Sequence, residues 1–353
     1  MHSSTRRQWL MGASLQAAGL GALLWPGAAQ ALPARTLAFP RDHGSHPELR
    51  TEWWYITGHV QAQGQPWGFQ LTFFRSRVDA TQGLQSAFAA KQLLFAHAAI
   101  TDVKGQRLQH DQRIARAGFG VAQASQADTH IRLQDWTLER VDVSHNTPGE
   151  APRSRYTTRI TGSELGLELQ FDSTQPVLLQ GQQGLSRKGP EATQASYYYS
   201  QPQLAVSGHL TVAGRRMAVE PGTGRAWMDH EWSEALMHPD AVGWDWFGMN
   251  LFDGHSVTAF QLRRQDGSKL WAGGSFRAAG SAQSPTDIYR FRPGELDWVP
   301  QRYWTSPRTR ARYPVEWMVR TPADFYTVKA VIDPQELDAQ GSTGTVYWEG
   351  LSN

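Results

Sequence analysis

The densest group of potentially reactive side chains lies in two neighbouring stretches of the chain. They read Trp227-Met228-Asp229-His230-Glu231-Trp232 and Gly243-Trp244-Asp245-Trp246-Phe247. Carboxylic acids and histidine transfer protons, and the faces of aromatic rings stabilise a positive charge. Together these residue types indicate proton-transfer chemistry on an apolar compound.

Side chains alternate between the two faces of a β-strand, so residues i and i+2 share a face. If both stretches are strands, His230 and Trp232 point one way and the two carboxylates of that stretch point the other. By the same rule Asp245 lies opposite the tryptophans on either side of it. One face of each strand must look into the interior of the protein.

Asp245 is the residue that we expect to act as the acid. If it faces a barrel lumen walled by indole rings, burial disfavours the charged form of its carboxyl group and keeps it protonated. A neutral acid of this kind can protonate an unactivated alkene, and His230 can orient the water that adds to the carbocation. The alternative interpretation is structural, with tryptophans filling the barrel and Asp245 paired with an arginine such as Arg225 or Arg263.

A second aromatic group, Glu52-Trp53-Trp54-Tyr55, resembles the stretch that begins at Asp245. Each group is followed by a turn and then by a Phe-Gln-Leu segment, at residues 69–71 and 260–262. This internal repeat predicts two similar β-barrels or sandwiches in tandem. The expected ligand-lining residues are Trp53, Trp54, Tyr55, Trp227, Trp244 and Trp246.

Short alternating segments separated by glycine-containing turns dominate the remaining sequence, and they predict an all-β, antiparallel protein. Only residues 80–99 and 333–337 carry moderate helical signals. A polar stretch at residues 180–203 marks the expected join, although three consecutive tyrosines there, at 197–199, are unusual for a linker. We therefore expect an N-terminal domain at residues 32–190 and a C-terminal domain at residues 191–353.

The first 31 residues have the features of an export signal. Arg6 and Arg7 precede an apolar run, and Ala29-Gln30-Ala31 fits a small-x-small cleavage site. The pattern predicts a twin-arginine signal peptide, a partnership with the twin-arginine export machinery, and a periplasmic or secreted bacterial protein. No later segment reaches the length and apolar character of a transmembrane helix.

Composition excludes several classes of protein. The 353 residues include no cysteine, which rules out disulfides, thiolate nucleophiles and cysteine-ligated metals. The 34 Lys and Arg nearly balance the 32 Asp and Glu, so nucleic acid is not an expected partner. The 15 tryptophans indicate a wide apolar lining or core.

Motifs for nucleotide binding and for hydrolysis by a serine elbow are missing from the sequence. His43 and His46 could join His230 as metal ligands, but histidines in a loop near a new N-terminus are more often solvated. We expect neither a metal nor a cofactor.

The aromatic stretches, together with His46-Pro47-Glu48, resemble the family of carotenoid 1,2-hydratase and AttH-like lipocalin-type proteins. The likeness covers residues 40–350. It implies two packed lipocalin-like β-domains and several roles. These include cofactor-independent hydration of acyclic carotenoids, hydration of a prenylated isoflavonoid by a fungal relative, pericyclic reactions, and exported members labelled only as predicted secreted hydrolases.

In the carotenoid enzymes an aspartate donates a proton beside a histidine, a tryptophan and a tyrosine. His230 and Trp232 match the His-x-Trp element, and Asp245 is the match for the aspartate. The sequence departs from this pattern at Gly243, where the tyrosine is expected. Members also continue past the Tyr-Trp-Glu-Gly element at residues 347–350, so we expect the second domain to lack its last strand.

Three functions are compatible with these features. The first is an exported, hydratase-type lyase that acts on an isoprenoid, polyene or other apolar alkene, with Asp245, His230 and Trp232 as catalytic residues. The second is a periplasmic carrier of a hydrophobic ligand such as a lipid. The third is a secreted hydrolase that uses Asp229 and Glu231 as paired carboxylates.

Overall fold

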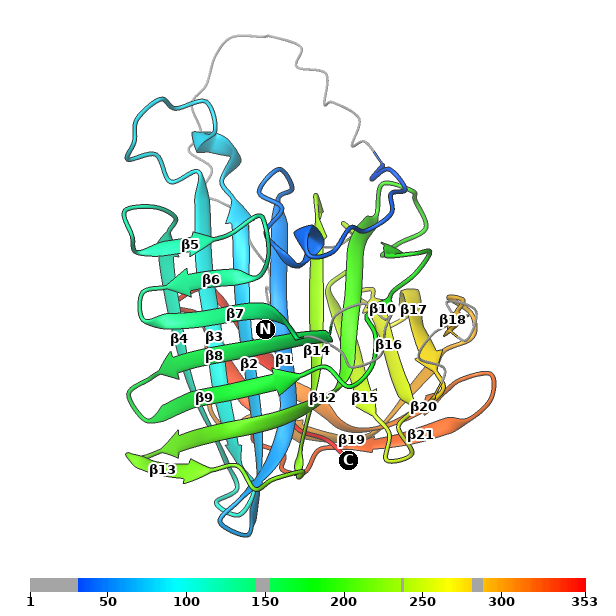
Figure 1. Cartoon of the computed structure of the whole chain (residues 1–353). Coiled ribbons are helices and arrows are strands. Elements are labelled where there is room, and N and C mark those ends of the chain that lie inside the picture. The colour runs from blue at the N-terminus through cyan, green and yellow to red at the C-terminus, as the bar shows by residue number, and fades with distance from the viewer. Residues whose placement is uncertain (1–30, 144–152, 236–237, 281–287) are drawn as a thin grey trace, which may run out of the picture.

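The computed structural model of the protein describes residues 31–143, 153–235, 238–280 and 288–353 (Figure 1). Within these residues the regular elements are strands, apart from two short 3-10 turns, η1 (Arg41–His43) and η2 (Asp79–Thr81). The prediction of an all-β, antiparallel protein is confirmed. The predicted export signal, except Ala31, lies outside the described residues.

In the described residues, fourteen antiparallel strands form one large sheet. Its main path runs β4-β3-β2-β1-β14-β12-β9-β8-β7-β6-β5, and β10, β11 and β13 pair with β12. Strands β5–β9 cross in front of β1–β4, so the sheet folds over itself into a nearly closed barrel (Figure 1). The bounds are β1 (Thr51–Ala62), β2 (Gln65–Arg77), β3 (Gln92–Asp102), β4 (Arg107–Arg116), β5 (Ala122–Ala124), β6 (His130–Leu133), β7 (Trp136–Val143), β8 (Arg153–Thr161), β9 (Leu165–Asp172), β10 (Leu178–Leu179), β11 (Leu185–Arg187), β12 (Ala195–Val212), β13 (Arg215–Ala218) and β14 (Gly224–Ser233).

Strand β12 carries the sheet from one layer to the other. Its first part pairs with β14 and its last part, from Ala205 onward, pairs with β9. The register shifts between Gln201 and Leu204, and this bulge lets the strand change direction. Gly208 has a φ of 117°, and a Cβ atom there would lie 2.1 Å from the carbonyl oxygen of Glu168, so β9 can approach only because residue 208 is glycine.

The two layers of the large sheet enclose the main hydrophobic core. Along strands such as β1, β8 and β9 the core residues alternate with outward-facing ones, as the sequence pattern predicts. Large side chains from both layers fill the interior: Trp54, Ile56, Leu71, Phe73, Trp136, Tyr156, Phe171 and Trp232 are each at most 1% exposed. The barrel is therefore packed with side chains near its centre.

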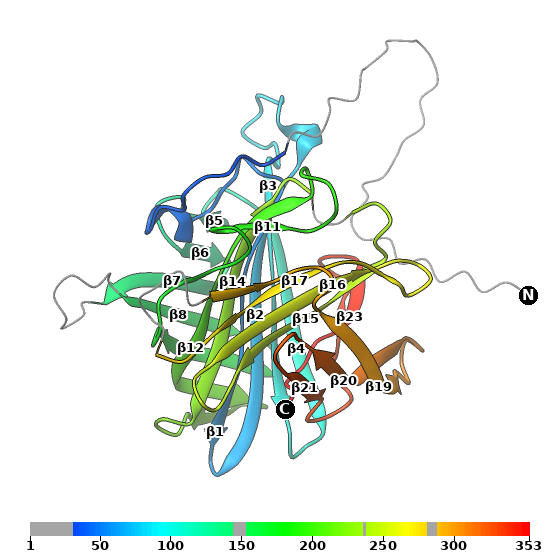
Figure 2. The same ribbon diagram turned by 90° about the vertical axis from the view of Figure 1, so that its right-hand side faces the viewer.

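The later strands form three smaller sheets with a separate core around Trp298 and Trp317. The first of these sheets passes in front of the large one, and β15 packs against β14 and β12 (Figure 2). The bounds are β15 (Gly243–Asn250), β16 (Ser256–Arg263), β17 (Lys269–Arg277) and β18 (Ile288–Phe291); β19 (Asp297–Thr305), β20 (Arg312–Arg320) and β21 (Phe325–Lys329); and β22 (Glu336–Ala339) with β23 (Thr345–Trp348).

The change from the large sheet to the smaller ones falls between β14 and β15. Residues 180–203, where the domain join was expected, instead contribute β11 and the start of β12 to the large sheet. The repeat noted in the sequence corresponds to two hairpins, β1–β2 and β15–β16. In each hairpin a carboxylate of the first strand pairs with an arginine of the second: Glu52 with Arg75 at 2.8 Å and Asp245 with Arg263 at 2.7 Å.

Both expected helices are wrong. Residues 80–99 contain the end of η2, a turn and most of β3, and residues 333–337 lead into β22. Strand β3 is buried along nearly its whole length, so it reads as a continuous apolar run without the alternation that marks a half-exposed strand. No helix of the described residues is long and apolar enough to cross a membrane.

Candidate functional site

Strands β1 and β14 lie side by side in the large sheet and carry most of the candidate residues. In their antiparallel register Trp54 is opposite His230, and Tyr55 is opposite Asp229. Alternation places the first pair inside the barrel and the second pair on its outer face. The same two strands therefore supply two separate polar sites.

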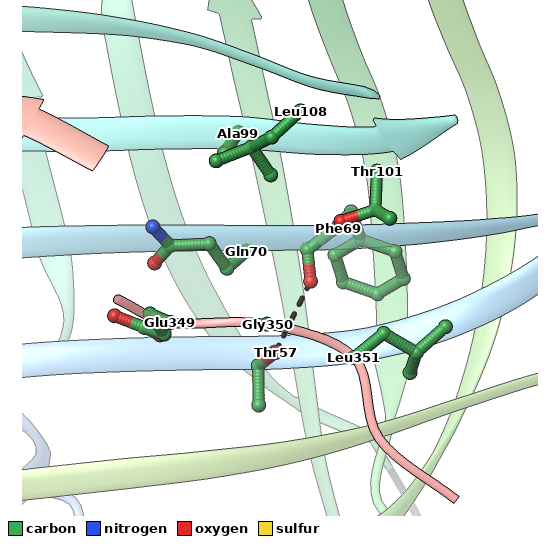
Figure 3. Close-up of a pocket in the computed structure, with 9 residues that line it drawn as sticks. All are labelled: Thr57, Phe69, Gln70, Ala99, Thr101, Leu108, Glu349, Gly350 and Leu351. Carbon is green, nitrogen blue, oxygen red and sulfur yellow. Dashed lines mark hydrogen bonds between the residues drawn. The ribbon is translucent and has the colours of Figure 1, made fainter. Parts of the chain in front are cut away.

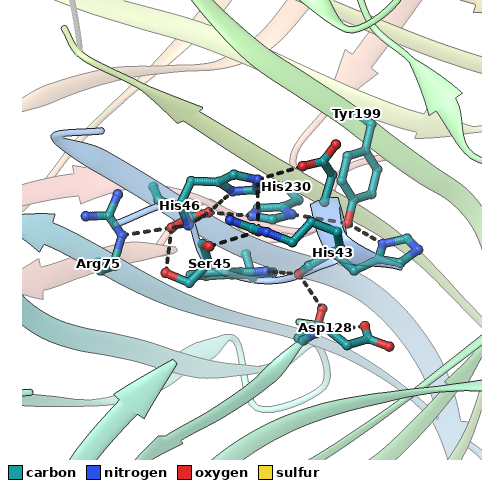
Figure 4. A network of polar contacts seen from close by, with 12 residues as sticks. His43, Ser45, His46, Arg75, Asp128, Tyr199 and His230 are labelled. Atoms are coloured by element: carbon teal, nitrogen blue, oxygen red, sulfur yellow. Dashed lines mark hydrogen bonds and ion pairs between the residues drawn. The ribbon is translucent and has the colours of Figure 1, made fainter. Parts of the chain in front are cut away.

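The inner site surrounds the carboxylate of Glu52, and we call it the Glu52 cluster. Figure 4 shows its histidines with Arg75 and Tyr199. The cluster consists of His43, His46, Glu52, Arg75, Tyr199 and His230. Oε1 of Glu52 lies 2.7 Å from Nδ1 of His46 and 3.0 Å from Nε2 of His230. The Nε group of Arg75 donates to Oε2 at 2.8 Å. All of Glu52, His46 and His230 are fully buried.

Aromatic rings cover the Glu52 cluster. The ring of His230 stacks on Trp54 at 4.5 Å, and that of His46 lies parallel to Trp232 at 4.0 Å. The hydroxyl of Tyr199 is 3.1 Å from Nδ1 of His230. These contacts hold both imidazoles in fixed orientations.

Glu52 and His230 differ in charge although both are fully buried. Burial alone would raise the pKa of Glu52, but hydrogen bonds with His230 and His46 outweigh it and lower that pKa. Burial lowers the pKa of His230 to about 4, although its bond with Glu52 opposes this shift. At neutral pH Glu52 is therefore an anion and His230 is uncharged.

The residues His46, Glu52 and His230 also have the chemistry of metal ligands. One ligand atom from each lies within 4.8 Å of the others. Oε1 of Glu52 is already at hydrogen-bond distance from both rings, and Arg75 balances its charge, although Nη2 of Arg75 is buried without a partner among the described residues. His43, the other candidate from the sequence, contacts Tyr199 at 2.7 Å instead.

The outer site lies where β14 meets β15, and we call it the seam cluster. It consists of Tyr55, Tyr198, Trp227, Asp229 and Trp246. Oδ1 of Asp229 accepts from Nε1 of Trp227 at 2.7 Å, and Oδ2 accepts from the hydroxyl of Tyr198 at 2.8 Å. Nε1 of Trp246 donates to the same Tyr198 hydroxyl at 3.3 Å. The bond from Trp246 to Tyr198 joins the two sheets, and the bond from Tyr198 continues to Asp229 within the large sheet.

Asp229 has the character that the sequence predicted for a proton donor. Its side chain is almost completely buried, and burial raises its pKa to about 7 despite hydrogen bonds from Ser200, Trp227 and Tyr198. Glu231, on the same face, forms an ion pair with Lys188 at 2.9 Å. A carboxyl group with this pKa can release and regain a proton at neutral pH.

Aromatic rings stand between Asp229 and the solvent. The rings of Tyr55 and Trp246 meet edge to face at 5.3 Å, and both residues are partly exposed. Trp227 packs edge to face with Trp246 at 6.3 Å and is buried. Asp229 is thus buried beside aromatic residues that are themselves partly exposed.

Asp245 lies on the opposite face of β15 from Trp246. Its Oδ2 accepts from Nε of Arg263 at 2.7 Å and from Nε2 of Gln261 at 2.9 Å. Its neighbour on that face, Phe247, stacks on Trp298 in the second core at 4.5 Å. Asp245 therefore sits in an ion pair, as in the structural interpretation, and not in a lumen walled by indoles. The structure does not bring it together with His230 and Trp232.

The six tryptophan and tyrosine residues expected to line one ligand site are divided among several surroundings. Trp54 lies in the barrel interior with Trp232, whereas Tyr55, Trp227 and Trp246 belong to the seam cluster. Trp244 is 42% exposed, and Trp53 is partly exposed. Only the seam cluster combines several of these rings with an acid of raised pKa.

A second acid with a raised pKa lies near the seam. Burial raises the pKa of Glu349 to about 7, while a hydrogen bond with Tyr55 opposes the shift. Glu349 lines a small cavity of about 10 Å³ between the C-terminal segment and β1–β3 (Figure 3). Oε1 of Glu349 and Nε2 of Gln70, which also lines the cavity, are buried without a hydrogen-bond partner among the described residues. Tyr55 thus stands between Glu349 and Asp229.

Comparison with known proteins identifies the family. Residues 30–353 match the model of the AttH-like family. The crystal structure of an AttH protein from Nitrosomonas europaea has 42% sequence identity and a TM-score of 0.79, over 91% of this chain and 93% of that one. The chain belongs to the AttH-like family.

A more distant structure shares the fold of this AttH-like protein. Kievitone hydratase from Nectria haematococca gives a TM-score of 0.58 at 13% identity, over 89% of this chain and 85% of that one. The resemblance seen in the aromatic motifs is confirmed at the level of family and fold. A search of curated proteins with this sequence finds no match.

Four residues in or beside the AttH-like protein's two sites were not singled out individually from the sequence: Arg75, Tyr198, Tyr199 and Glu349. Tyr198 and Tyr199 fall in the aromatic triplet that looked out of place in a linker, and they point to Asp229 and His230 respectively. Glu349 lies in the Tyr-Trp-Glu-Gly element near the C-terminus. The tyrosine triplet and the Tyr-Trp-Glu-Gly element were both visible in the sequence. No spacing rule connects them with Asp229 or His230, because these segments are far apart in the chain.

Proposed function

We propose that this AttH-like protein is exported, binds an apolar alkene such as an isoprenoid or polyene at the seam cluster, and adds water to it. The proposal makes it a cofactor-independent hydratase with Asp229 as the proton donor. The observation that carries it is the nearly buried carboxyl group of Asp229, whose pKa is raised to about 7 beside partly exposed aromatic rings.

The proposed reaction needs only groups of the chain and one water molecule. The carboxyl group of Asp229 transfers its proton to one alkene carbon, and the other carbon becomes a carbocation. The faces of Trp246 and Tyr55 stabilise this positive charge. Water then forms the new C–O bond and returns a proton to the Asp229 carboxylate, so the net change is alkene plus water to alcohol.

The hydrolase alternative is less well supported by the contacts. Glu231 is held by Lys188, and Asp229 accepts hydrogen bonds from three neutral donors. The pair therefore lacks one ionised base that is free to activate water. The carrier alternative shares the seam with the hydratase, so experiment must separate the two.

The test begins with the purified mature chain, extracted into organic solvent and examined by mass spectrometry for a bound apolar compound. That compound, or an acyclic isoprenoid alkene, is then incubated with the protein in ¹⁸O-labelled water. We expect a labelled alcohol from the wild type and a loss of about 100-fold or more for Asp229→Asn, the scale of general acid catalysis.

Asp245→Asn is the matched control, because Asp245 is ion-paired on the other face of β15. We expect its rate to stay within a few-fold of the wild type. Binding without any labelled product would identify a carrier and overturn the hydratase proposal. Loss of turnover in Asp245→Asn with full turnover in Asp229→Asn would overturn the assignment of the acid.

A further inference from the structure

An exposed apolar surface lies at one end of the barrel, away from the seam. It is formed by two connections, between β2 and β3 and between β4 and β5, which stand at the upper left of the view in Figure 1. Their apolar side chains are open to solvent: Leu84 is 51% exposed, Phe88 74%, Phe119 59% and Val121 41%. We call these four residues the loop-tip patch.

The loop-tip patch is held together before any partner arrives. The rings of Phe88 and Phe119 stack at 5.5 Å although they come from different connections. The guanidinium group of Arg116 lies 4.2 Å from the ring of Phe119 and donates to the carbonyl oxygen of Phe88 at 2.6 Å. The two aromatic side chains are therefore presented as one unit.

Cations lie next to the rings of the patch: Arg116 contacts Phe119, and Arg132 donates to the carbonyl oxygen of Gly120. The exposed Asp135 lies at the edge of the patch, because its neighbour Gln134 donates its backbone N–H to the carbonyl oxygen of Val121. Residues 80–101 and 112–127, which form and flank it, contain no Asp or Glu. They contain the exposed Lys91 as well as Arg116, and neither forms an ion pair within the described part of the chain. The acid nearest in sequence, Asp79, is already paired with Arg77 at 2.7 Å.

We propose that the loop-tip patch docks the protein on a lipid bilayer that carries anionic headgroups. Aromatic and leucine side chains on loop tips can enter the boundary between headgroups and acyl chains, and neighbouring cations attract anionic lipids. The Arg116 guanidinium group, which lies by the rings of both Phe88 and Phe119, and the exposed Lys91 supply the cations that anionic headgroups would meet beside these rings. The proposal stands independently of the hydratase function.

The test measures binding of the mature chain to vesicles of phosphatidylglycerol and of phosphatidylcholine by flotation. We expect binding to the anionic vesicles that is at least about 10-fold stronger than to the neutral ones and that weakens with salt. The double variant Phe88→Ser with Phe119→Ser should lose about 10-fold or more of this binding. Arg116→Gln should reduce the preference for the anionic lipid.

Phe252→Ser is the matched control, because Phe252 is fully exposed in the turn between β15 and β16. We expect it to bind vesicles like the wild type. No binding of the wild type to anionic vesicles would overturn the proposal, as would an equal loss in the Phe252 control. Concentration-dependent dimerisation that the double variant abolishes, without vesicle binding, would instead assign the patch to self-association.

Discussion

Two buried carboxyl groups on neighbouring strands have pKa values shifted in opposite directions, because each one has a different kind of partner. Glu52 meets two imidazoles and a guanidinium group, which stabilise its negative charge. Asp229 meets a hydroxyl, a phenol and an indole N–H, which are neutral donors and offset less of the cost of burying a charge. The inner acid is therefore suited to holding structure and the outer one to transferring a proton.

Replacement of Asp229 should reveal its raised pKa as a dependence of stability on pH. Since the pKa rises from 3.8 to about 7, the folded state retains a proton that the unfolded chain loses, and wild type loses stability as pH rises through this interval. Asparagine does not titrate, so the stability of Asp229→Asn does not fall with pH for this reason. At about 1.4 kcal/mol per pKa unit, we expect the variant to gain on the order of 4 kcal/mol relative to wild type between pH 4 and 8.

Urea unfolding at a series of pH values measures this difference directly. The comparison between wild type and variant cancels the contributions of other titrating groups, including His230, whose lowered pKa acts in the opposite direction. A difference in the free energy of unfolding that stayed constant over this pH range would show that Asp229 is an ordinary ionised carboxylate.

Replacement of Glu52 should affect stability much more than replacement of an exposed acid. Glu52→Gln leaves the buried Arg75 without its counter-charge, which typically costs about 3 kcal/mol or more. Because the pKa of Glu52 is lowered, this contribution is present at neutral pH and is lost as pH falls into the acid range. Glu48→Gln, at an exposed position, is the control for denaturant unfolding at pH 7. Equal effects of the two changes would argue against the Glu52 cluster as a structural centre.

At the scale of elements, alternation was sufficient to predict which side chains share a face of a single strand. It placed His230 with Trp232 and Asp229 with Glu231 on opposite faces of what proved to be β14, and the contacts agree. It failed for β3, which is buried on both faces and so lacks an alternating pattern. In β14, which is also buried on both faces, the charged and polar residue types still distinguished the two faces, whereas the apolar run of β3 carries no such signal.

Pairing between distant strands could not be predicted from the sequence. The inner cluster needs β1 beside β14, two segments separated by most of the large sheet in chain order. The seam needs β15 to turn Trp246 toward Tyr198 and Asp245 away from it. The sequence pointed to Asp245 as the buried acid, whereas burial raises the pKa of Asp229 and Asp245 is ion-paired with Arg263.

Gly208 allows a test of how closely β12 must pack against β9 where it joins the two layers of the sheet. Gly208→Ala would place a methyl group against the backbone of β9 in a positive-φ conformation, so we expect a loss of stability of about 2 kcal/mol or more. Gly294→Ala is the control, because its Cβ would meet open space and its backbone is not in the positive-φ region. The midpoint of thermal unfolding reads out both variants. Equal midpoints would mean that β9 and β12 have room to separate.

At the scale of the whole molecule, the polar seam joins the large sheet to the smaller ones. Each side has its own hydrophobic core, and the hydrogen bonds from Trp246 to Tyr198 and from Asn250 to Ala226 span the boundary between them. The loop-tip patch lies at the end of the barrel. A molecule with this arrangement could rest on a bilayer while its seam stays accessible to an apolar compound.

Export belongs to the same scale and is tested in cells. Replacement of Arg6 and Arg7 by lysine should stop passage through the twin-arginine pathway, because that pathway reads the paired arginines. We expect wild type in the periplasmic fraction or the medium and the variant inside the cell, as followed by immunoblotting of fractions. A single Arg50→Lys change in the folded region is the control. Unchanged export of the paired variant would contradict the predicted signal.

The most direct test of the central claim is the titration of the Asp229 carboxyl carbon by ¹³C NMR. The mature chain is labelled at aspartate side-chain carbonyl carbons, and the Asp229 signal is identified by its disappearance in Asp229→Asn. A midpoint near pH 7 is the result that a buried proton donor in the seam requires. A midpoint near 4 or below would show that Asp229 is ionised at neutral pH, and the proposed hydratase would lose its acid.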